Sequence, residues 1–452
     1  MAHKLMEKVL KLFRQRGTIS SSRVILALFG GLIIVGTLLL MLPFSYAGEQ
    51  HVRLIDALFT STSAVCVTGL VVHDSATAWT PFGQFVILAL IELGGLGFVT
   101  SVLFFRVLAD RGRSIIRRSI LRDAVSVPQI GGINQLLSFI LSVSLAAELI
   151  GAALVAPAFV RDYGLMGIWY AVFHSVSAFC NAGFDILGGH VEFSSLIAYQ
   201  TDPVVILVTA GLIIFGGIGF LTWDDVRKHG RHIRRYRLQT KLVLAGTFFL
   251  LLIPFLLFFY YEFRGISLKR RLLLSFFCAV TPRTAGFASV DYGVMSESGR
   301  LLTGMLMLIG GSSGSTAGGI KVTTLMVVLM ATRAVLKQER DTTAFGRRVE
   351  PELVRKAFVF FVIYVSLWAI GSLFICVYEE VPALNAMFEC ASALATVGLS
   401  TGITPSLRMR SKLLLIAFMF FGRIGGLTMA YAFSQPASVS AAKYPTERLA
   451  VG

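Results

Sequence analysis

The sequence is poor in charged residues, histidine and cysteine. Charged residues make up 15% of its 452 residues, and there are seven histidines and five cysteines. The histidines lack the H-E-x-x-H spacing of a zinc hydrolase, and no carboxylate pair falls inside an apolar run at helical spacing. Neither a disulfide nor a zinc site is expected from the cysteines, which show no metal-ligand spacing: Cys66, Cys180, Cys278, Cys376 and Cys390.

These scarcities argue against an enzyme and against a bound cofactor. The chain also has no G-x-G-x-x-G after a strand and no G-x-x-x-x-G-K-[ST], the two glycine patterns that hold nucleotide phosphates. Any control by nucleotides is therefore expected to come from another polypeptide.

Apolar residues are in excess. They make up 55% of the chain, the mean hydropathy is +0.76, and apolar runs of about 20 residues recur. A soluble protein of this size could not bury so much apolar surface. The pattern predicts an all-α polytopic membrane protein with spans at 23–46, 82–105, 133–156, 203–223, 241–261, 300–331, 357–378 and 411–433.

The net charge of +16 does not indicate a nucleic-acid-binding protein, because the positions of the Lys and Arg residues have another explanation. Most Lys and Arg residues lie in segments that alternate across the spans, as the positive-inside rule predicts for cytoplasmic loops. Both termini are therefore predicted to be cytoplasmic, with an amphipathic segment at 1–22 and a tail at 434–452. The basic loops Arg227–Arg237 and Arg333–Lys356 are candidate docking surfaces for an acidic partner or for anionic membrane lipid.

Four shorter segments lie between the members of consecutive span pairs, at 54–65, 167–179, 269–280 and 382–395. A helix of 12 to 14 residues rises only about 20 Å, against about 30 Å for the hydrocarbon core. A single such segment could be an amphipathic turn in an outer loop. Four at matching positions predict re-entrant helices that enter and leave by the same face.

Glycines close these short segments at regular intervals. Gly69, Gly183, Gly286 and Gly398 follow one another at roughly 100 to 115 residues. The stretches LGGLGF (93–98), FGGIGF (215–220) and FGRIGGLT (421–428) are related to one another and lie in the second span of their units. The chain is therefore predicted to hold four tandem membrane helix/pore helix/membrane helix repeats with pseudo-fourfold symmetry around one pore, at 23–105, 133–223, 241–331 and 357–433.

The glycine loops are candidates for an ion-binding selectivity filter. Non-helical backbone at membrane depth is tolerated where it lines a watery cavity, and rings of carbonyl oxygens can replace the hydration shell of an ion such as K⁺. Carbonyl oxygens stacked along one axis require backbone dihedrals that alternate in handedness, and glycine accepts the positive φ values of that pattern. The predicted filter residues are Val67, Thr68, Gly69, Asn181, Ala182, Gly183, Thr284, Ala285, Gly286, Thr396, Val397 and Gly398.

Several polar residues surround this predicted filter. The C-terminal ends of the short helices would point their partial negative charge at a cation. Acidic residues at the outer mouth either concentrate cations or are merely solvated: Asp74, Asp185, Asp291 and Glu297. His174 and Glu389 each stand nine residues before a filter glycine, where a satisfied hydrogen bond behind the filter is the simpler interpretation.

The span at 300–331 contains a predicted gate. Five glycines in ten residues should break its helix, at about 1 kcal/mol each relative to alanine, although close helix packing would also use small residues. Arg423, in the middle of the last span, needs water, a carbonyl or a counter-charge, for which Glu148 is one candidate. The gate residues are Gly310, Gly311, Ser312, Ser313, Gly314, Ser315, Thr316, Ala317, Gly318, Gly319, Lys321 and Arg423.

At these residues the chain resembles the Trk/Ktr/HKT superfamily of potassium transporters, and most of all its bacterial KtrB branch. The matching pieces are IDALFTSTSAVCVTGL, FHSVSAFCNAGF, AVTPRTAGF, STAGGIK, TVGLSTGITP, FGRIGGLT and KYP. The extra helix pair usual in TrkH-type relatives is not seen before the first span near Arg23.

The resemblance implies a function and partners. It implies potassium uptake across the bacterial cytoplasmic membrane by a homodimer with one pore per subunit, controlled by a KtrA-like cytoplasmic ring of nucleotide-binding RCK proteins. Some plant members with sodium preference carry serine at the first filter glycine, where this chain has Gly69. A sodium-permeable or sodium-coupled transporter remains the alternative, and Na⁺ is a possible activator.

Overall fold

A computed structural model of the chain describes residues 21–48, 52–97, 133–189, 191–425 and 447. The described residues form helices arranged in four consecutive units. Residues 1–20 of the predicted amphipathic segment at 1–22, and most of the predicted tail at 434–452, lie outside the described residues. The first unit contains α2 (Ser21–Leu40), α3 (Leu54–Val65) and α4 (Pro81–Gly95). The second contains α7 (Ile133–Tyr163), α8 (Met166–Phe179), α9 (Pro203–Ile218) and α10 (Phe220–His229).

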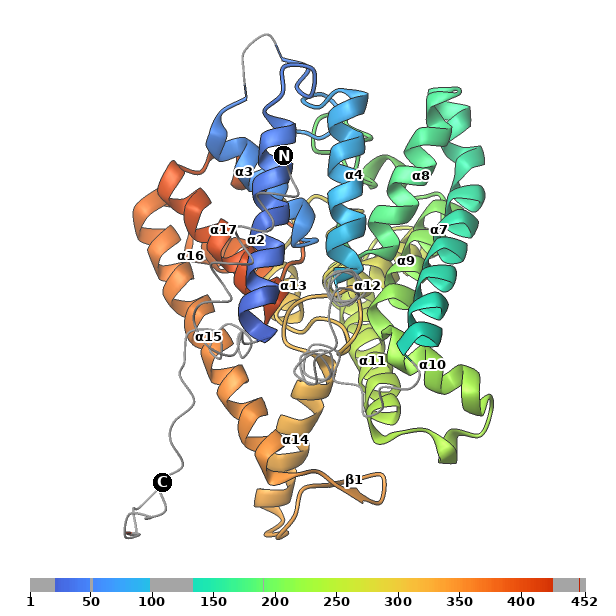
Figure 1. Cartoon of the computed structure of the whole chain (residues 1–452), viewed down its shortest axis with the longest axis vertical. Coiled ribbons are helices and arrows are strands. Elements are labelled where there is room, and N and C mark those ends of the chain that lie inside the picture. Colours follow the sequence, from blue (N-terminus) through green and yellow to red (C-terminus); the bar gives the residue numbers. More distant parts are fainter. Residues whose placement is uncertain (1–20, 49–51, 98–132, 190, 426–446, 448–452) are drawn as a thin grey trace, which may run out of the picture.

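The third and fourth units repeat this order (Figure 1). The third contains α11 (Leu238–Leu257), the π-helical η4 (Phe258–Glu262), α12 (Leu268–Val280), α13 (Glu297–Met307) and α14 (Val322–Leu336). The fourth contains α15 (Pro351–Glu379), α16 (Ala383–Leu394) and α17 (Met409–Ile424). The remaining pieces are the 3-10 turns Ile197–Tyr199, Ile233–Arg235 and Thr404–Ser406, and an antiparallel hairpin of β1 (Thr343–Ala344) and β2 (Arg347–Arg348).

The short helices match their predicted positions. The helices α3, α8, α12 and α16 begin and end within one residue of the four segments expected from the sequence. Each has 12 to 14 residues and is too short to cross a bilayer. The prediction of four short helices between longer ones is therefore confirmed.

The longer helices confirm the membrane assignment and correct one span. In the described part of the chain, Gln135–Tyr163, Leu238–Glu262 and Pro351–Glu379 are each long and apolar enough to cross a membrane. The span predicted as continuous at 203–223 is instead broken, because α9 and α10 meet at an angle of 88°. Gly219 makes the break, with a φ of 93° that lies outside the helical region.

Polar residues of the short helices are buried against the long ones. In α3, Ser61 donates a hydrogen bond from Oγ to the carbonyl of Ile33 on α2 at 2.8 Å, beside Gly36. In α8, Ser175 donates in the same way to Glu148 on α7 at 2.6 Å. These two hydroxyls have partners in the neighbouring helix, which offsets the cost of burying them.

The four units close into a ring. In each unit, a helix that follows the short helix packs on the short helix of the next unit: α4 on α8, α9 on α12, α13 on α16, and α17 on α3. The short helices therefore lie in the interior, with long helices around them. This arrangement brings the loops that follow the short helices toward one another.

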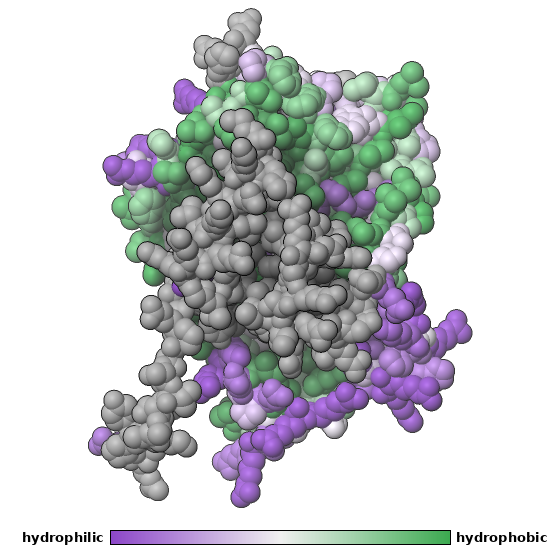
Figure 2. Space-filling model, in the orientation of Figure 1, coloured by the Kyte–Doolittle hydropathy of each residue, from purple (hydrophilic) through white to green (hydrophobic). Residues whose placement is uncertain are grey.

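The outer surface divides into an apolar part and a hydrophilic end. Apolar side chains are exposed on α2 and α7, among them Ile34, Leu38, Leu145 and Leu149. Figure 2 shows hydrophilic residues at the lower end, where Figure 1 places α10 and the β1–β2 hairpin. An apolar flank with a basic, exposed end is the surface of a membrane-embedded protein.

Candidate functional site

The four predicted filter glycines lie together in a closed cycle. A Cβ atom added to any of them would collide with a backbone carbonyl oxygen of the next loop. The oxygens met by Gly69, Gly183, Gly286 and Gly398 belong to Ala182, Ala285, Val397 and Thr68, in that order. Loops that are more than 100 residues apart in the sequence thus meet backbone to backbone, and only glycine leaves room for this contact.

The backbone of these loops alternates between conformations. The filter glycines have φ values of 88°, 67°, 80° and 99°. The first residue of each triplet is also left-handed, with φ of 55° at Val67, 59° at Asn181, 65° at Thr284 and 55° at Thr396. Left-handed conformations of non-glycine residues are uncommon and cost roughly 1 to 3 kcal/mol each, so their recurrence in all four loops marks a functional backbone.

Hydroxyl side chains hold the loops in this strained form. Ser63 and Ser392 each accept a hydrogen bond from the N–H of the following filter glycine at 3.0 Å. Ser177 and Thr281 instead donate to the carbonyl just after their glycines, at 2.7 and 2.6 Å. Sequence analysis missed this set, although a hydroxyl residue five or six positions before every filter glycine is visible in the sequence.

His174 and Glu389 are structural, as the simpler interpretation held. The ring of His174 contacts the Tyr170 carbonyl through Nδ1 at 2.7 Å. The buried carboxyl of Glu389 accepts from Ser400 Oγ at 2.7 Å, from the Thr401 N–H at 2.8 Å and from Thr404 Oγ1 at 2.6 Å. Glu389 therefore braces the segment that follows Gly398.

The acidic residues expected at the outer mouth differ from one another. Asp74 is only 5% exposed and accepts hydrogen bonds from the N–H groups of Ala76, Thr77 and Phe193 at 2.9, 3.1 and 2.7 Å. It joins the first outer segment to the second and is not a solvated mouth residue. Asp185 is half-buried, and Asp291 and Glu297 are exposed.

The predicted gate residues at 310–319 and Lys321 lie in a non-helical loop between α13 and α14, whereas Arg423 lies on α17. Gly310 and Ile320 are joined by a backbone hydrogen bond of 2.9 Å, so that the segment between them folds back on itself. A Cβ on Gly310 would lie 3.0 Å from Thr284 Cγ2, and one on Gly318 would collide with Thr396 Oγ1. The loop thus lies against the first filter residues of the third and fourth units.

The same loop also contacts the second unit. Thr316 Oγ1 lies 3.2 Å from both the Phe179 carbonyl and Asn181 Oδ1, at the end of α8. Asn181 Nδ2 in turn donates to the carbonyl of Arg283 at 3.2 Å. The side chain of Asn181 therefore links the loop, the second filter segment and the third.

Two half-buried cationic side chains donate to carbonyl oxygens of this loop. Arg423 donates from Nη1 to the Thr316 carbonyl, and from Nη2 to the carbonyls of Gly94 and, at 3.0 Å, Gly95. Lys321 donates from Nζ to the Ala317 carbonyl at 2.6 Å. Arg423 thus joins the loop to α4 through carbonyls, and Glu148 is not its partner.

The α9–α10 break holds the other side of the loop. The Ser312 N–H donates to the Gly217 carbonyl at 3.0 Å, and Ser312 Oγ donates to Ile218. The Phe220 N–H donates back to the Gly314 carbonyl at 3.0 Å. Because Gly219 bends the chain here, carbonyls of the broken span become available to the loop. The sequence suggested no role for this break.

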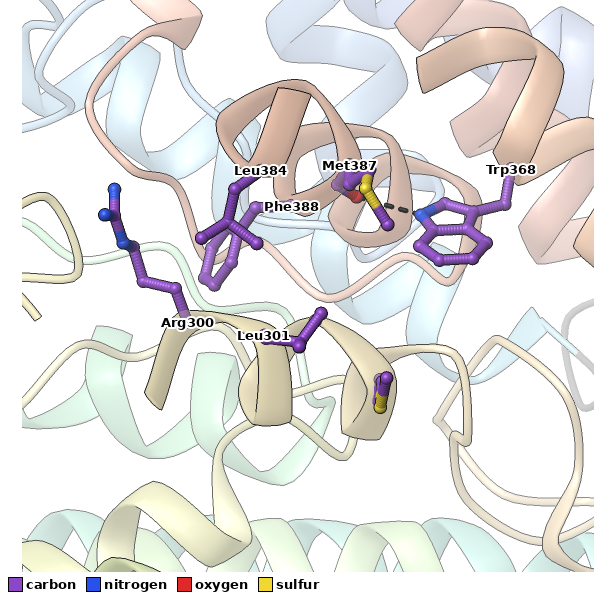
Figure 3. A pocket seen from close by; sticks show the side chains of 8 residues that line it. Arg300, Leu301, Trp368, Leu384, Met387 and Phe388 are labelled. Atoms are coloured by element: carbon purple, nitrogen blue, oxygen red, sulfur yellow. Dashed lines mark hydrogen bonds between the residues drawn. The ribbon is translucent and has the colours of Figure 1, made fainter. Parts of the chain in front are cut away.

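A small groove lies between the third and fourth units, away from the filter. Figure 3 shows Arg300 and Leu301 of α13 facing Leu384 and Phe388 of α16. Arg300 donates from Nη1 to Asn385 Oδ1 at 2.9 Å. This contact ties the two units together, and none of the residues that line the groove belongs to the predicted filter or gate.

Taken together, four re-entrant helices, a closed cycle of glycine loops and a loop across one end define a polytopic membrane transport protein. The comparisons with known proteins agree. Residues 20–441 match the TrkH family model, described as a cation transport protein. The chain therefore belongs to the TrkH family of cation transport proteins.

Two relatives and one solved structure illustrate the similarity. The chain is 40% identical to the potassium/sodium uptake protein NtpJ of Enterococcus hirae, covering 97% of this chain and 99% of that one. It is 39% identical to the Ktr system potassium uptake protein B of Bacillus subtilis, covering 93% and 94%. The crystal structure of the potassium transporter TrkH from Vibrio parahaemolyticus has the same fold, with a TM-score of 0.72 at 20% identity over 93% of this chain and 86% of that one.

Proposed function

We propose that this chain is the ion-translocating pore subunit of a Ktr-type system and takes up potassium across the bacterial cytoplasmic membrane. The observation that carries the proposal is the closed cycle of the four filter glycines, each lying against a carbonyl of the next loop. The names of the two relatives above, which describe potassium or potassium/sodium uptake, support the choice of ion.

In this proposal the backbone carbonyls of the four triplets replace the water around a dehydrating K⁺ ion. The sign of φ alternates along each triplet, which is the backbone pattern that would turn successive carbonyls toward one axis. The C-terminal ends of α3, α8, α12 and α16 lie just before the triplets and add partial negative charge. The four units would be related by pseudo-fourfold symmetry around this axis, with repeats at 23–105, 133–223, 241–331 and 357–433.

The loop at 310–319 would be the gate. Its contacts with Asn181, Thr284 and Thr396 support a position across one end of the filter segments. Arg423 and Lys321 would hold it closed and would also repel cations, since both carry positive charge next to the pathway. Opening requires the loop to leave these carbonyl contacts, and ions then flow down their electrochemical gradient.

Control would come from outside the chain. We propose a homodimer, bound at its cytoplasmic face by a ring of RCK-type nucleotide-binding subunits. The exposed arginines of the α10–α11 connection and of the β1–β2 hairpin form the basic surface for that contact, with Arg234 and Arg348 among them. Both termini would lie on the same cytoplasmic side.

Sodium permeation is the second candidate, and it is supported by the name of the Enterococcus relative, which describes potassium/sodium uptake. Replacing Gly69 by serine separates the two. In a potassium filter the new Cβ displaces the Ala182 carbonyl and potassium preference falls, as measured by the ratio of Rb⁺ to Na⁺ uptake.

The direct test of uptake is growth of a potassium-uptake-deficient bacterium at low external potassium, with and without a co-expressed ring subunit. Rescue by this chain supports the proposal. Absence of rescue, together with Na⁺ uptake by the same cells, would support sodium permeation in its place.

A further inference from the structure

A cluster of potential metal ligands lies beside the filter and has no part in the proposed pathway. Glu92 of α4, Glu148 of α7 and Cys180, the residue that caps α8, offer two carboxyl oxygens and a sulfur atom. These three atoms lie within 4.8 Å of one another, and Cys180 Sγ is 3.4 Å from Glu92 Oε2. The residues are far apart in the sequence, so residue spacing could not have shown the cluster.

The cluster is buried, and among the described residues its two carboxyl groups have no ion-pair partner. Glu148 is only 7% exposed, Cys180 is fully buried, and Glu92 is half-buried. Glu148 Oε1 has no hydrogen-bond partner within the described residues. Arg423 directs its guanidinium to the carbonyls of Gly94, Gly95 and Thr316 and to neither carboxyl.

Two carboxyl groups in a low-dielectric region repel each other unless positive charge lies between them. Within the described ranges, no ion pair joins a lysine, arginine or histidine to Glu92 or Glu148. A proton shared between Glu92 and Glu148 would remove this repulsion in the metal-free protein, and a bound cation would remove it as well. The sulfur of Cys180 is the feature of the cluster that favours a metal ion. A thiol adds little to a shared proton, whereas it is a preferred ligand of borderline and soft metal ions.

The surrounding structure holds the three ligands in place. A Cβ on Gly95 would lie 2.7 Å from Cys180 Sγ, so this glycine leaves the space in which the sulfur approaches α4. Ser175 of α8 bonds to the carbonyl of Glu148 at 2.6 Å and sets the register of α8 on α7. Ligands carried by packed helices and fixed by such contacts are preorganised for binding.

We propose that Glu92, Glu148 and Cys180 form a binding site for a divalent metal ion of the Zn²⁺ class. Two carboxylates and one thiolate supply three ligands, which leaves a fourth tetrahedral position for water. Binding releases to solvent both the thiol proton and the proton shared by the two carboxyl groups, and the divalent ion balances two of the three negative charges of its ligands.

Occupation of the site would act on the filter. Cys180 directly precedes Asn181, the first residue of the second filter segment and the contact of Thr316. A metal bound to all three ligands fixes the end of α8 to α4 and α7, and so restricts the movement of that filter segment. This consequence for transport rests on the proposed function, whereas metal binding itself does not.

Binding is tested on the full-length protein purified in detergent, with Cd²⁺ as the probe in thiol-free buffer under nitrogen. We expect one saturable Cd²⁺ per chain with a cadmium–thiolate ultraviolet absorption band. Cys180→Ser should abolish the band, and Glu148→Gln should weaken affinity by at least about 10-fold, since even residues around metal ligands typically contribute 10- to 100-fold.

The matched control is Cys66→Ser. Cys66 also stands three residues before a filter glycine and is fully buried, but it belongs to no ligand cluster among the described residues. It should keep the band and the affinity. The site would be overturned if both Cys180→Ser and Glu148→Gln bound Cd²⁺ as the wild type does, or if Cys66→Ser lost binding to the same extent as Cys180→Ser. It would also be overturned if the wild type showed no saturable Cd²⁺ binding, which would leave a shared proton as the only explanation of the cluster.

Transport is measured separately, as Rb⁺ uptake into proteoliposomes. We expect Cd²⁺ to slow uptake by the wild type and by Cys66→Ser, but not by Cys180→Ser. Saturable binding without any effect on uptake would refute the action on the filter and leave the metal site standing. Absent uptake in metal-free wild type would count against the proposed function alone.

Discussion

The contact between Thr316 and Asn181 offers a test of how the proposed gate loop is held against the proposed filter. Thr316 has one hydroxyl proton, shared between the Phe179 carbonyl and Asn181 Oδ1 at 3.2 Å each. Thr316→Val keeps the side-chain shape and removes this donor. A net hydrogen bond contributes about 0.5 to 1.5 kcal/mol, so the closed loop should lose stability by a factor of about 2 to 13.

The assay is Rb⁺ uptake into proteoliposomes, normalised to reconstituted protein and performed without a ring subunit. If loop closure limits the flux, uptake by Thr316→Val should rise by a factor of up to about 13. Ser315→Ala is the matched control, because the Ser315 hydroxyl donates within the loop, to the Ser312 carbonyl at 2.7 Å, and does not touch the filter.

A double-mutant cycle with Asn181→Ala completes the test. If the two side chains act through their shared contact, the effects of Thr316→Val and Asn181→Ala should not add. Additive effects would show that the two side chains do not act through this contact. An unchanged flux in Thr316→Val together with a raised flux in Ser315→Ala would show that the contact does not hold the loop.

Three further substitutions have defined outcomes. Gly398→Ala places a Cβ against the Thr68 carbonyl at a φ of 99° and should lower potassium preference in Rb⁺/Na⁺ competition, whereas Gly211→Ala, in open space on α9, should not. Arg423→Gln removes charge-assisted hydrogen bonds worth about 1.5 to 3 kcal/mol each and should raise Rb⁺ flux. A lowered flux in a folded protein would contradict the proposal that Arg423 holds the loop closed. Glu389→Ala leaves several donors without an acceptor and should lower the melting temperature in detergent, and an unchanged value would refute its bracing role.

Much of the fold was predictable because the bilayer imposes strict lengths. The limits of α3 followed from its sequence, since a 12-residue segment between apolar spans cannot cross and must return. The filter glycines were predictable for a related reason, because each unit repeats the same backbone requirement. Their closed cycle was expected and is observed.

What could not be predicted depends on contacts between distant units. The bend at Gly219 is stabilised by Ser312 and Gly314 of another unit, so nothing local distinguished a break from a continuous span. The left-handed backbone of Val67 opposes the preference of a β-branched residue and is held by its surroundings. The partners of Arg423 are backbone carbonyls, which no residue pattern reveals.

The central claim is that backbone oxygens of the four glycine loops coordinate the transported ion. Anomalous diffraction from crystals grown in Rb⁺ tests it most directly. The account predicts an anomalous peak enclosed by carbonyl oxygens of the triplets that end at Gly69, Gly183, Gly286 and Gly398. Rb⁺ bound elsewhere in the membrane region, with no peak among these four loops in a protein that transports Rb⁺, would contradict it.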